Sequence, residues 1–565
     1  MKTSLADRQQ SANTLRLSLT AVLVALVLSA VFRAAFSAYF LLDDFGMLSI
    51  VRFLDNPLEP FVRNHIPGGL YYRPLGMILW WLSERLFGAN APDHYLINLF
   101  LHAAVAAALW HLVSKVCASR WIGLAAAACF ALHPIGVGTT LWLSDRFDLL
   151  ALLFGLLGLA SALDFSRNGA KRALFRTLAL LSLALLSKEI ALACFAATGV
   201  IWLSAEYESR LAARIRTCLI LCLPVAIYLL VRFSVLGFPS AEMLSADEGN
   251  SGSLTLLADG FSNWVLGWLD YFTYRYRLDG WKAITSTIGF LLLFALGVAA
   301  SLQPWNLRRR QAMFAGLVLW LSTGVLQFPL LGHFSVRLNE ATDVVSAIVS
   351  SRYFYSSLAG FLIAAAVLLS PLCLARKWAG VCATSAIFML ILVWFSASQD
   401  ASRGHRIETR AQKEIVDAAI LAMDSMVIPI DGCQVYLLDT TSWAFGWISD
   451  EAIKATTPNL QRVSGCLVQT EHTPWYHIAT LDRLDPLSLR PLSVIVGGGE
   501  SAAQQPIGRA RFLLLNLEAN APVPTDSKAR FLSWQGREFV DVTDDVMSGR
   551  RKPGFVCNRS PNQCK

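Results

Sequence analysis

Apolar runs long enough to cross a lipid bilayer recur along most of this 565-residue chain, from about Leu17 to Phe395. A membrane-spanning helix needs roughly 20 predominantly apolar residues. Because lipid offers no water to satisfy backbone groups, such runs must fold as helices. Hydrophobic residues make up 55% of the chain and charged residues only 16%. The pattern predicts a polytopic α-helical membrane protein with about 11 spans, not a large soluble core.

Clusters of Lys and Arg between the runs predict the topology, because cytoplasmic loops are enriched in these residues. Lys2, Arg8 and Arg16 precede the first predicted span, residues 17–42, so we expect the N-terminus in the cytoplasm. The net charge of +8 then reflects this bias and gives no indication of nucleic-acid binding.

The same count divides the chain into two predicted domains. Residues 1–398 form the transmembrane domain, with a first outer loop at about 43–93. An odd number of spans places residues 399–565 outside the cytoplasm. This segment alternates strand-like runs with polar turns, which predicts a small α/β domain.

Asp43 and Asp44 follow directly on the first apolar run. At the mouth of a membrane helix the dielectric constant is low, and desolvation there raises the pKa of a carboxyl group. A carboxylate with a raised pKa suits a general base. The alternative is that the pair simply ends the helix in water.

Further charged side chains collect at the predicted outer ends of the spans. Such groups are costly at membrane depth and are therefore functional candidates. Arginine suits a phosphate because its planar guanidinium donates two parallel hydrogen bonds. The set comprises Asp43, Asp44, Arg73, Asp145, Arg146, Asp148, Lys188, Glu189 and Arg352.

Metal and cysteine chemistry are less prominent. Asn98 and His102 share one helix face by their spacing, but a metal site needs a third ligand, so a divalent metal is not favoured. Of 11 cysteines, four lie in the polar C-terminal segment. An even number outside the cytoplasm predicts two disulfides, with the pairing open. These candidates are Cys433, Cys466, Cys557 and Cys564.

Short blocks occur in a characteristic order between about residues 38 and 365. They are DDF at 43–45, YYRPL at 71–75, HYLINLFLH at 94–102, HP at 133–134, SDRFDLLALLF at 144–154, SKE at 187–189 and SRYFYSSLAGF at 351–361. Together they resemble the multispanning C-type (GT-C) glycosyltransferases, and most closely the transmembrane-and-TPR O-mannosyltransferases and their bacterial relatives. The chain departs from that pattern because the HP block lacks a following acidic residue, SSLAGF lacks a proline, and no TPR array follows.

The resemblance implies a mechanism. A polyprenyl-phosphate-linked sugar would be the donor, and Asp44 or Asp43 would take the proton of the acceptor hydroxyl, with inversion at the sugar. The donor phosphate would be held by Arg73, Arg146, Lys188 and Arg352. Supporting residues would be Tyr72, Asn98, His102, His133, Asp148, Glu189, Tyr353 and Tyr355, with Asp148 and Glu189 orienting Arg146 and Lys188.

It also implies partners and a location. The acceptor would be a glycan, a lipid or a protein, membrane lipids would surround the spans, and no cofactor is needed. We expect a multi-pass protein of the bacterial inner membrane with a periplasmic C-terminal domain.

Three other classes remain open. An O-antigen ligase or polymerase would use Arg and His residues in a large late loop. A lipid-carrier flippase or transporter would spread charges through mid-membrane depth. A non-enzymatic membrane scaffold would give no function to the charged residues at the outer ends of the first spans.

Overall fold

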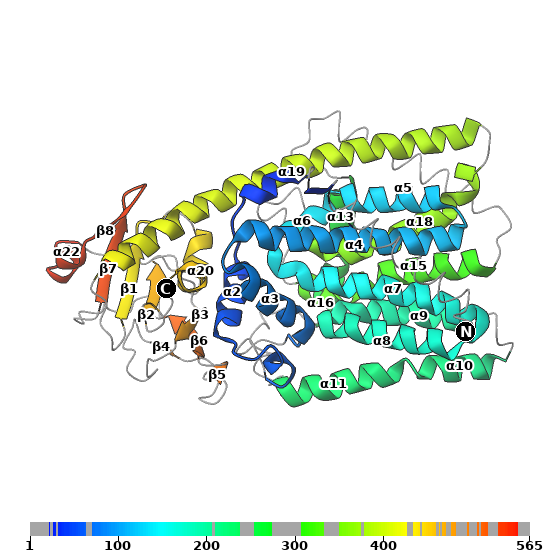
Figure 1. Ribbon diagram of the computed structural model, residues 1–565, viewed down its shortest axis with the longest axis horizontal. Coiled ribbons are helices and arrows are strands. Elements are labelled where there is room, and N and C mark those ends of the chain that lie inside the picture. The colour runs from blue at the N-terminus through cyan, green and yellow to red at the C-terminus, as the bar shows by residue number, and fades with distance from the viewer. Residues whose placement is uncertain are drawn as a thin grey trace, which may run out of the picture. The chain divides into compact units, whose positions relative to one another are not determined.

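The computed structural model divides into two compact units, which are considered separately (Figure 1). Unit 1 comprises residues 1–37, 92–231 and 239–406, and unit 2 comprises 38–91, 232–238 and 407–565. The structure describes residues 22, 26, 28, 29, 32–63, 71–205, 210–237, 253–273, 307–332, 350–374, 378–426, 433–440, 443–458, 463, 466–470, 476–481, 494–495, 506–507, 510–517 and 529–551.

Unit 1 is built from helices. Their bounds are η1 Arg33–Ser37, α4 Ala91–Cys117, α5 Arg120–Leu132, α6 Ile135–Leu141, η3 Leu143–Asp145, α7 Arg146–Asn168, α8 Lys171–Ser187, η4 Glu189–Ala191, α9 Leu192–Leu203, α10 Leu211–Leu219, α11 Cys222–Leu236, α13 Ser253–Thr273, α15 Leu307–Val325, α16 Phe328–Leu331, η5 Arg352–Phe354, α18 Tyr355–Leu374 and the first part of α19 Trp378–Ser425.

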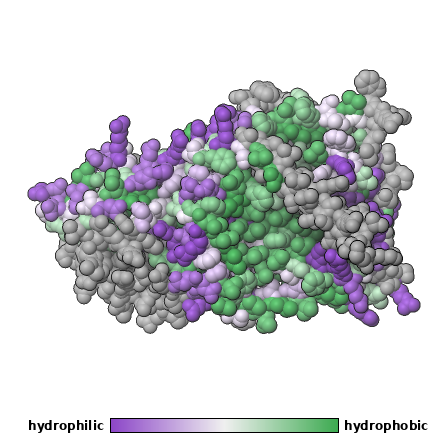
Figure 2. Space-filling view, in the orientation of Figure 1, coloured by the Kyte–Doolittle hydropathy of each residue, from purple (hydrophilic) through white to green (hydrophobic). Residues whose placement is uncertain are grey.

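The predicted polytopic helical membrane protein is confirmed. Within the described residues, five helices are long and apolar enough to cross a membrane, or six if the pair α5 and α6, bent by 64°, is counted as one. Figure 2 shows hydrophobic side chains gathered over the helices of this unit. The predicted total of about 11 spans extends into ranges outside the described residues.

Small residues let two of these helices approach closely. A Cβ atom added at Gly360 would lie 2.5 Å from the backbone nitrogen of Trp320 on α15, and one added at Gly316 would lie 2.8 Å from the carbonyl oxygen of Gly360. Contacts this short are not tolerated by real side chains, so α15 and α18 pack backbone to backbone at these glycines, as is common between membrane helices.

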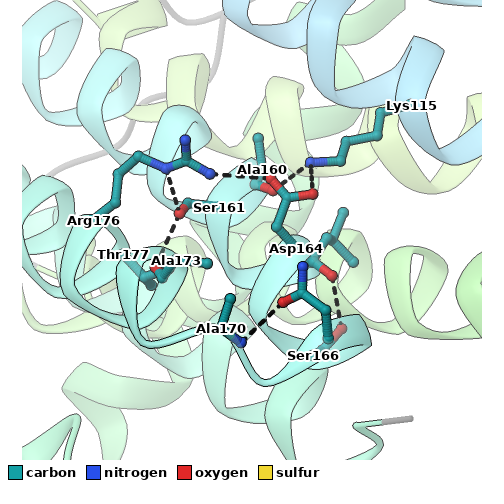
Figure 3. Close-up of polar contacts among 11 residues, drawn as sticks. Lys115, Ala160, Ser161, Asp164, Ser166, Ala170, Ala173, Arg176 and Thr177 are labelled. Carbon is teal, nitrogen blue, oxygen red and sulfur yellow. Dashed lines mark hydrogen bonds and ion pairs between the residues drawn. The ribbon is translucent and has the colours of Figure 1, made fainter. Parts of the chain in front are cut away.

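A polar cluster joins the C-terminal ends of α4 and α7 to the start of α8 (Figure 3). Asp164 accepts from Lys115 Nζ at 2.5 Å and from Arg176 Nη2 at 3.1 Å. Arg176 Nε also donates to Ser161 Oγ at 2.9 Å. All three charged side chains remain between 26% and 42% exposed, so this cluster faces water.

One predicted span needs correction. Residues 17–42 do not form a continuous helix to Leu42, because η1 ends at Ser37 and residues 38–41 are not helical. The backbone N–H of Tyr39 donates to Thr409 Oγ1 at 3.1 Å, and that of Leu41 donates to Asp44 Oδ2 at 3.0 Å. These donors are satisfied by side chains, so the chain can leave the helix without a loss of hydrogen bonding.

Unit 2 contains the first outer loop and the C-terminal segment. Its helices are α2 Asp43–Phe53, η2 Glu59–Phe61, α3 Pro74–Phe87, α20 Trp443–Thr456 and α22 Thr543–Met547, with the last part of α19. Its strands are β1 Cys433–Leu438, β2 Cys466–Thr470, β3 Tyr476–Leu481, β4 Val494–Ile495, β5 Pro506–Ile507, β6 Ala510–Leu517, β7 Ala529–Trp534 and β8 Phe539–Asp541. The strands and α20 and α22 of this unit all lie in the C-terminal segment, in the order β1, α20, β2 to β8 and α22 among the described residues.

Two small sheets form in this unit. One has the order β2-β1-β7-β8, in which β1 runs parallel to both β2 and β7, and the other has the order β3-β6-β4 with β5 paired to β6. The connection from β1 to the parallel β2 passes through α20, as a parallel pair requires. Tyr436 and Phe531 stack at 4.9 Å in the core of the first sheet.

Candidate active site

The acidic pair begins α2, in unit 2. Asp44 is fully buried, whereas Asp43 is exposed. Leu42, just before the pair, has a φ of +46°, a conformation that residues other than glycine rarely adopt. Strained backbone of this kind clusters at functional sites. The two carboxylates therefore have different surroundings, and only Asp43 is open to a ligand from solvent.

The helix end also favours two carboxylates electrostatically. The N-terminus of a helix carries a partial positive charge, which stabilises anions in its first turn. One side-chain oxygen of Asp44 accepts a hydrogen bond from the backbone N–H of Leu41. Asp44 thus shapes the turn from which Asp43 projects.

Tyr72 and Arg73 belong to the same unit. The Tyr72 hydroxyl donates to the Phe61 carbonyl at 3.1 Å, and burial raises the pKa of Tyr72, so it stays protonated. Arg73 lies over the Tyr71 ring at 4.4 Å, where cation–π attraction holds its guanidinium. Both residues lie at the start of α3, whose first residue is Pro74.

A second charged cluster lies in unit 1, at the N-terminal end of α7. Lys188 forms ion pairs with Asp145, at 3.3 Å, and with Asp148. The two carboxylate side chains are only 6% and 5% exposed, and the lysine side chain 18%. Lys188 separates α8 from η4, so the break in the helix brings its ammonium to α7.

Arg352 lies beside this cluster. Its guanidinium stands 3.8 Å from the centre of the Trp142 ring and donates to the Tyr353 hydroxyl at 2.8 Å. Asp145 is within electrostatic range of both Arg352 and Lys188. The structure therefore brings together four predicted residues, Asp145, Asp148, Lys188 and Arg352. The role of Trp142 was not predicted, because an aromatic residue in an apolar run carries no distinguishing signal.

Two more predicted residues, Arg146 and Glu189, are sequence neighbours of this cluster. Arg146 is fully buried, and its Nε donates to the Leu143 carbonyl at 3.2 Å. Asp148, which we expect to orient these cations, contacts Lys188. Glu189 begins η4 next to Lys188.

The predicted histidines and Asn98 are buried among helices. His102 bonds the Tyr355 hydroxyl at 2.8 Å through Nδ1 and the Ala131 carbonyl at 3.1 Å through Nε2, so both ring nitrogens are used in packing. His133 Nδ1 accepts the Ile135 N–H at 3.1 Å, and Asn98 donates to the Thr140 carbonyl at 3.3 Å. These contacts hold α4, α5, α6 and α18 together behind the charged cluster.

The described residues include part of the predicted disulfide set and allow a search for metal sites. No group of three His, Cys, Asp or Glu side chains that could hold a metal occurs among them. Cys466 is disulfide-bonded, and Cys433 is its direct neighbour in the register of β1 and β2. Cys557 and Cys564 lie outside the described residues.

No protein-family model matches the chain. Part of it is similar to an O-mannosyl-transferase. Over 128 residues it is 35% identical to Protein O-mannosyl-transferase Tmtc2 of Drosophila melanogaster. The match covers 21% of this chain and only 14% of that relative, so the chain spans about one seventh of the curated protein's length.

Two solved structures of ArnT from Cupriavidus metallidurans are also similar to the chain. The one bound to undecaprenyl phosphate matches with a TM-score of 0.43 and 15% identity, over 90% of this chain and 99% of that one. The apo structure matches with a TM-score of 0.41 over 88% and 97%.

Proposed function

We propose that the chain is an integral-membrane glycosyltransferase that moves a sugar from a polyprenyl-phosphate donor to an acceptor hydroxyl on the periplasmic side. The observation that carries the proposal is the buried cluster of Lys188, Asp145 and Asp148, with Arg352 within electrostatic range of Asp145. Ionisable groups at the end of a membrane helix are expensive, and a phosphate-binding role would account for their presence. The local similarity to an enzyme named as an O-mannosyl-transferase supports the same class.

In this proposal the cations act on the donor. Lys188 and Arg352 would bind the phosphate and stabilise the negative charge that develops on it as the sugar leaves. Asp145 and Asp148 would orient Lys188 through their ion pairs while the phosphate is absent. The planar guanidinium of Arg352, which lies over the Trp142 ring, can present two N–H groups to phosphate oxygens.

The acidic pair would act on the acceptor. Asp43 is the exposed member, so we propose it as the general base that takes the proton of the attacking hydroxyl, with inversion at the anomeric carbon. Asp44 would hold the turn that presents Asp43, through its bond to the Leu41 N–H.

The test is a complementation experiment. Envelope glycans, lipids and proteins from a strain lacking the gene are compared by mass analysis with those of the same strain carrying the wild-type chain or a variant. We expect one sugar modification to disappear on deletion and to return with the wild type. Asp43→Asn should restore less than about 1% of it, since a lost general base costs 10²–10⁴-fold in rate.

A second carboxylate of the same loop, Asp55, provides the control. Asp55→Asn removes another exposed carboxylate of the same loop and should restore the modification fully. If deletion changes no glycan, the proposed function is wrong. If Asp43→Asn restores full modification, the assignment of Asp43 as the general base is wrong.

A further inference from the structure

The helix that carries the acidic pair is fixed to a helix of the C-terminal segment. Arg52, in the last turn of α2, donates from Nη1 to three carbonyls at the end of α20: Lys454 at 2.8 Å, Ala455 at 2.9 Å and Thr457 at 3.0 Å. The last carbonyls of a helix lack partners within it, and a cation there also complements the helix dipole. Arg52 therefore caps α20 from another element.

Helix α20 is in turn fixed to its own sheet. Asp450 accepts the Val468 N–H of β2 at 3.0 Å and the Lys454 ammonium at 2.7 Å, and both side chains of this ion pair are fully buried. Removing Lys454 would leave Asp450 as an unpaired buried charge, so the ion pair keeps Asp450 in place for its bond to β2. The contacts run from the sheet through α20 to α2.

Helix α20 also carries a buried carboxyl, Glu451, that is within electrostatic range of Asp43. Glu451 is 8% exposed, and among the described residues its Oε2 has no hydrogen-bond partner. Burial raises the pKa of Glu451 well above its usual value, and the neighbouring charges of Asp450 and of Asp43 raise it further. Lys454 opposes this shift but is already paired with Asp450.

We propose that α20 is a working part of the acidic site: Arg52 is a positioning residue that fixes α2 on α20, and Glu451 is a buried carboxyl of α20 within electrostatic range of Asp43. This inference rests on the proposed function, because the positioning matters only if Asp43 acts on an acceptor. It assigns the C-terminal segment a role in presenting the catalytic carboxylate.

The arrangement makes the docking of α20 pH-dependent. Glu451 has a folded pKa above its unfolded value of about 4.3. The stability that protonated Glu451 contributes is therefore complete below that value and is lost as the pH rises through the folded pKa. Above it, Glu451 and Asp43 would both be negative and would repel each other across the contact.

The first experiment removes the hydrogen bonds between Arg52 and the last carbonyls of α20. In full-length protein in lipid nanodiscs, Arg52→Ala should speed hydrogen exchange at residues 43–53 and 451–457 by about tenfold. It should also lower kcat for sugar transfer by about tenfold with the donor KM unchanged, since small displacements of a catalytic group are costly. Arg52→Lys should recover part of both effects. The matched control is Arg63→Ala, which removes an exposed arginine of the same loop.

Each result decides a separate point. Unchanged exchange in Arg52→Ala would show that Arg52 does not dock the helices. Faster exchange with unchanged kcat would make the docking merely structural and overturn the assignment to the site. If the wild-type protein transfers no sugar, only the proposed function is wrong, because hydrogen exchange measures the docking of α2 on α20 independently of activity.

The second experiment tests whether the protonation of Glu451 controls the docking of α2 on α20. The protection factors of the amides at residues 43–53, which correct for the base-catalysed rise of intrinsic exchange, should fall in the wild type as the pH is raised through the folded pKa of Glu451. Glu451→Gln should abolish that fall because its amide stays neutral. A Gln variant that keeps the fall would exclude Glu451 as the group responsible.

Discussion

Helix α7 carries an ion cluster at each end, and the two clusters differ in their contact with water. At the C-terminal end, Asp164 pairs with Lys115 and Arg176, all of them at least 26% exposed. At the N-terminal end, Asp145 and Asp148 pair with Lys188, and the carboxylates are at most 6% exposed. Asp148 and Asp164 are about 24 Å apart along the helix, close to the thickness of a membrane core.

The two clusters also differ in whether a structural role alone explains why their charged residues are present. An exposed ion pair contributes about 0–1 kcal/mol and ties neighbouring helices together at low cost. A buried cluster must overcome the desolvation of its charges, and an apolar substitute is often as stable. The exposed cluster is thus adequately explained as a helix clamp, whereas the buried one suggests a ligand that needs the charges.

Removing the lysine from each cluster should show the largest contrast. Lys188→Ala leaves two buried carboxylates without their cation and should cost about 3–5 kcal/mol of stability. Lys115→Ala should cost about 0–1 kcal/mol. Thermal unfolding of both variants in the same detergent measures the difference. Equal losses would mean that the two clusters do not differ as described.

Neutralising one carboxylate at each end should separate function from stability. Asp148→Asn should lower sugar transfer by about a hundredfold, because Lys188 loses one of its two buried partners. Asp164→Asn should change transfer less than about threefold. Transfer by membranes containing equal amounts of each variant is the measurement. A comparable loss in Asp164→Asn would indicate that the helix clamp, and not the buried cluster, limits the reaction.

Exchanging arginine for lysine gives the smallest expected effect. Arg352→Lys keeps the charge but loses the contact of the guanidinium with the Trp142 ring, worth about 0.5–2 kcal/mol, so the donor KM should rise about two- to thirtyfold. Arg176→Lys, in the exposed cluster, should leave the donor KM unaltered. Steady-state kinetics with varied donor tests both. An unchanged KM in Arg352→Lys would remove this residue from the phosphate site.

The sequence determined the class of protein and the breaks between helices. Apolar runs require helices in lipid, so α4, α7 and α18 could be expected within a few residues. The charged residues of the SKE triplet coincide with the interruption between α8 and α9, since charged residues end an apolar run. Asp43 and Asp44 were recognisable as candidates because they follow the first run directly.

Only the tertiary structure decided which of these charges meet. Lys188 lies 40 or more residues from its partners Asp145 and Asp148, and Arg52 about 400 residues from the carbonyls that it caps. Such contacts depend on how distant helices pack, which no local pattern encodes. For the same reason Asp43 and Asp44, adjacent and chemically alike in the sequence, become an exposed carboxylate and a buried one, because burial is a property of the fold and not of the residue.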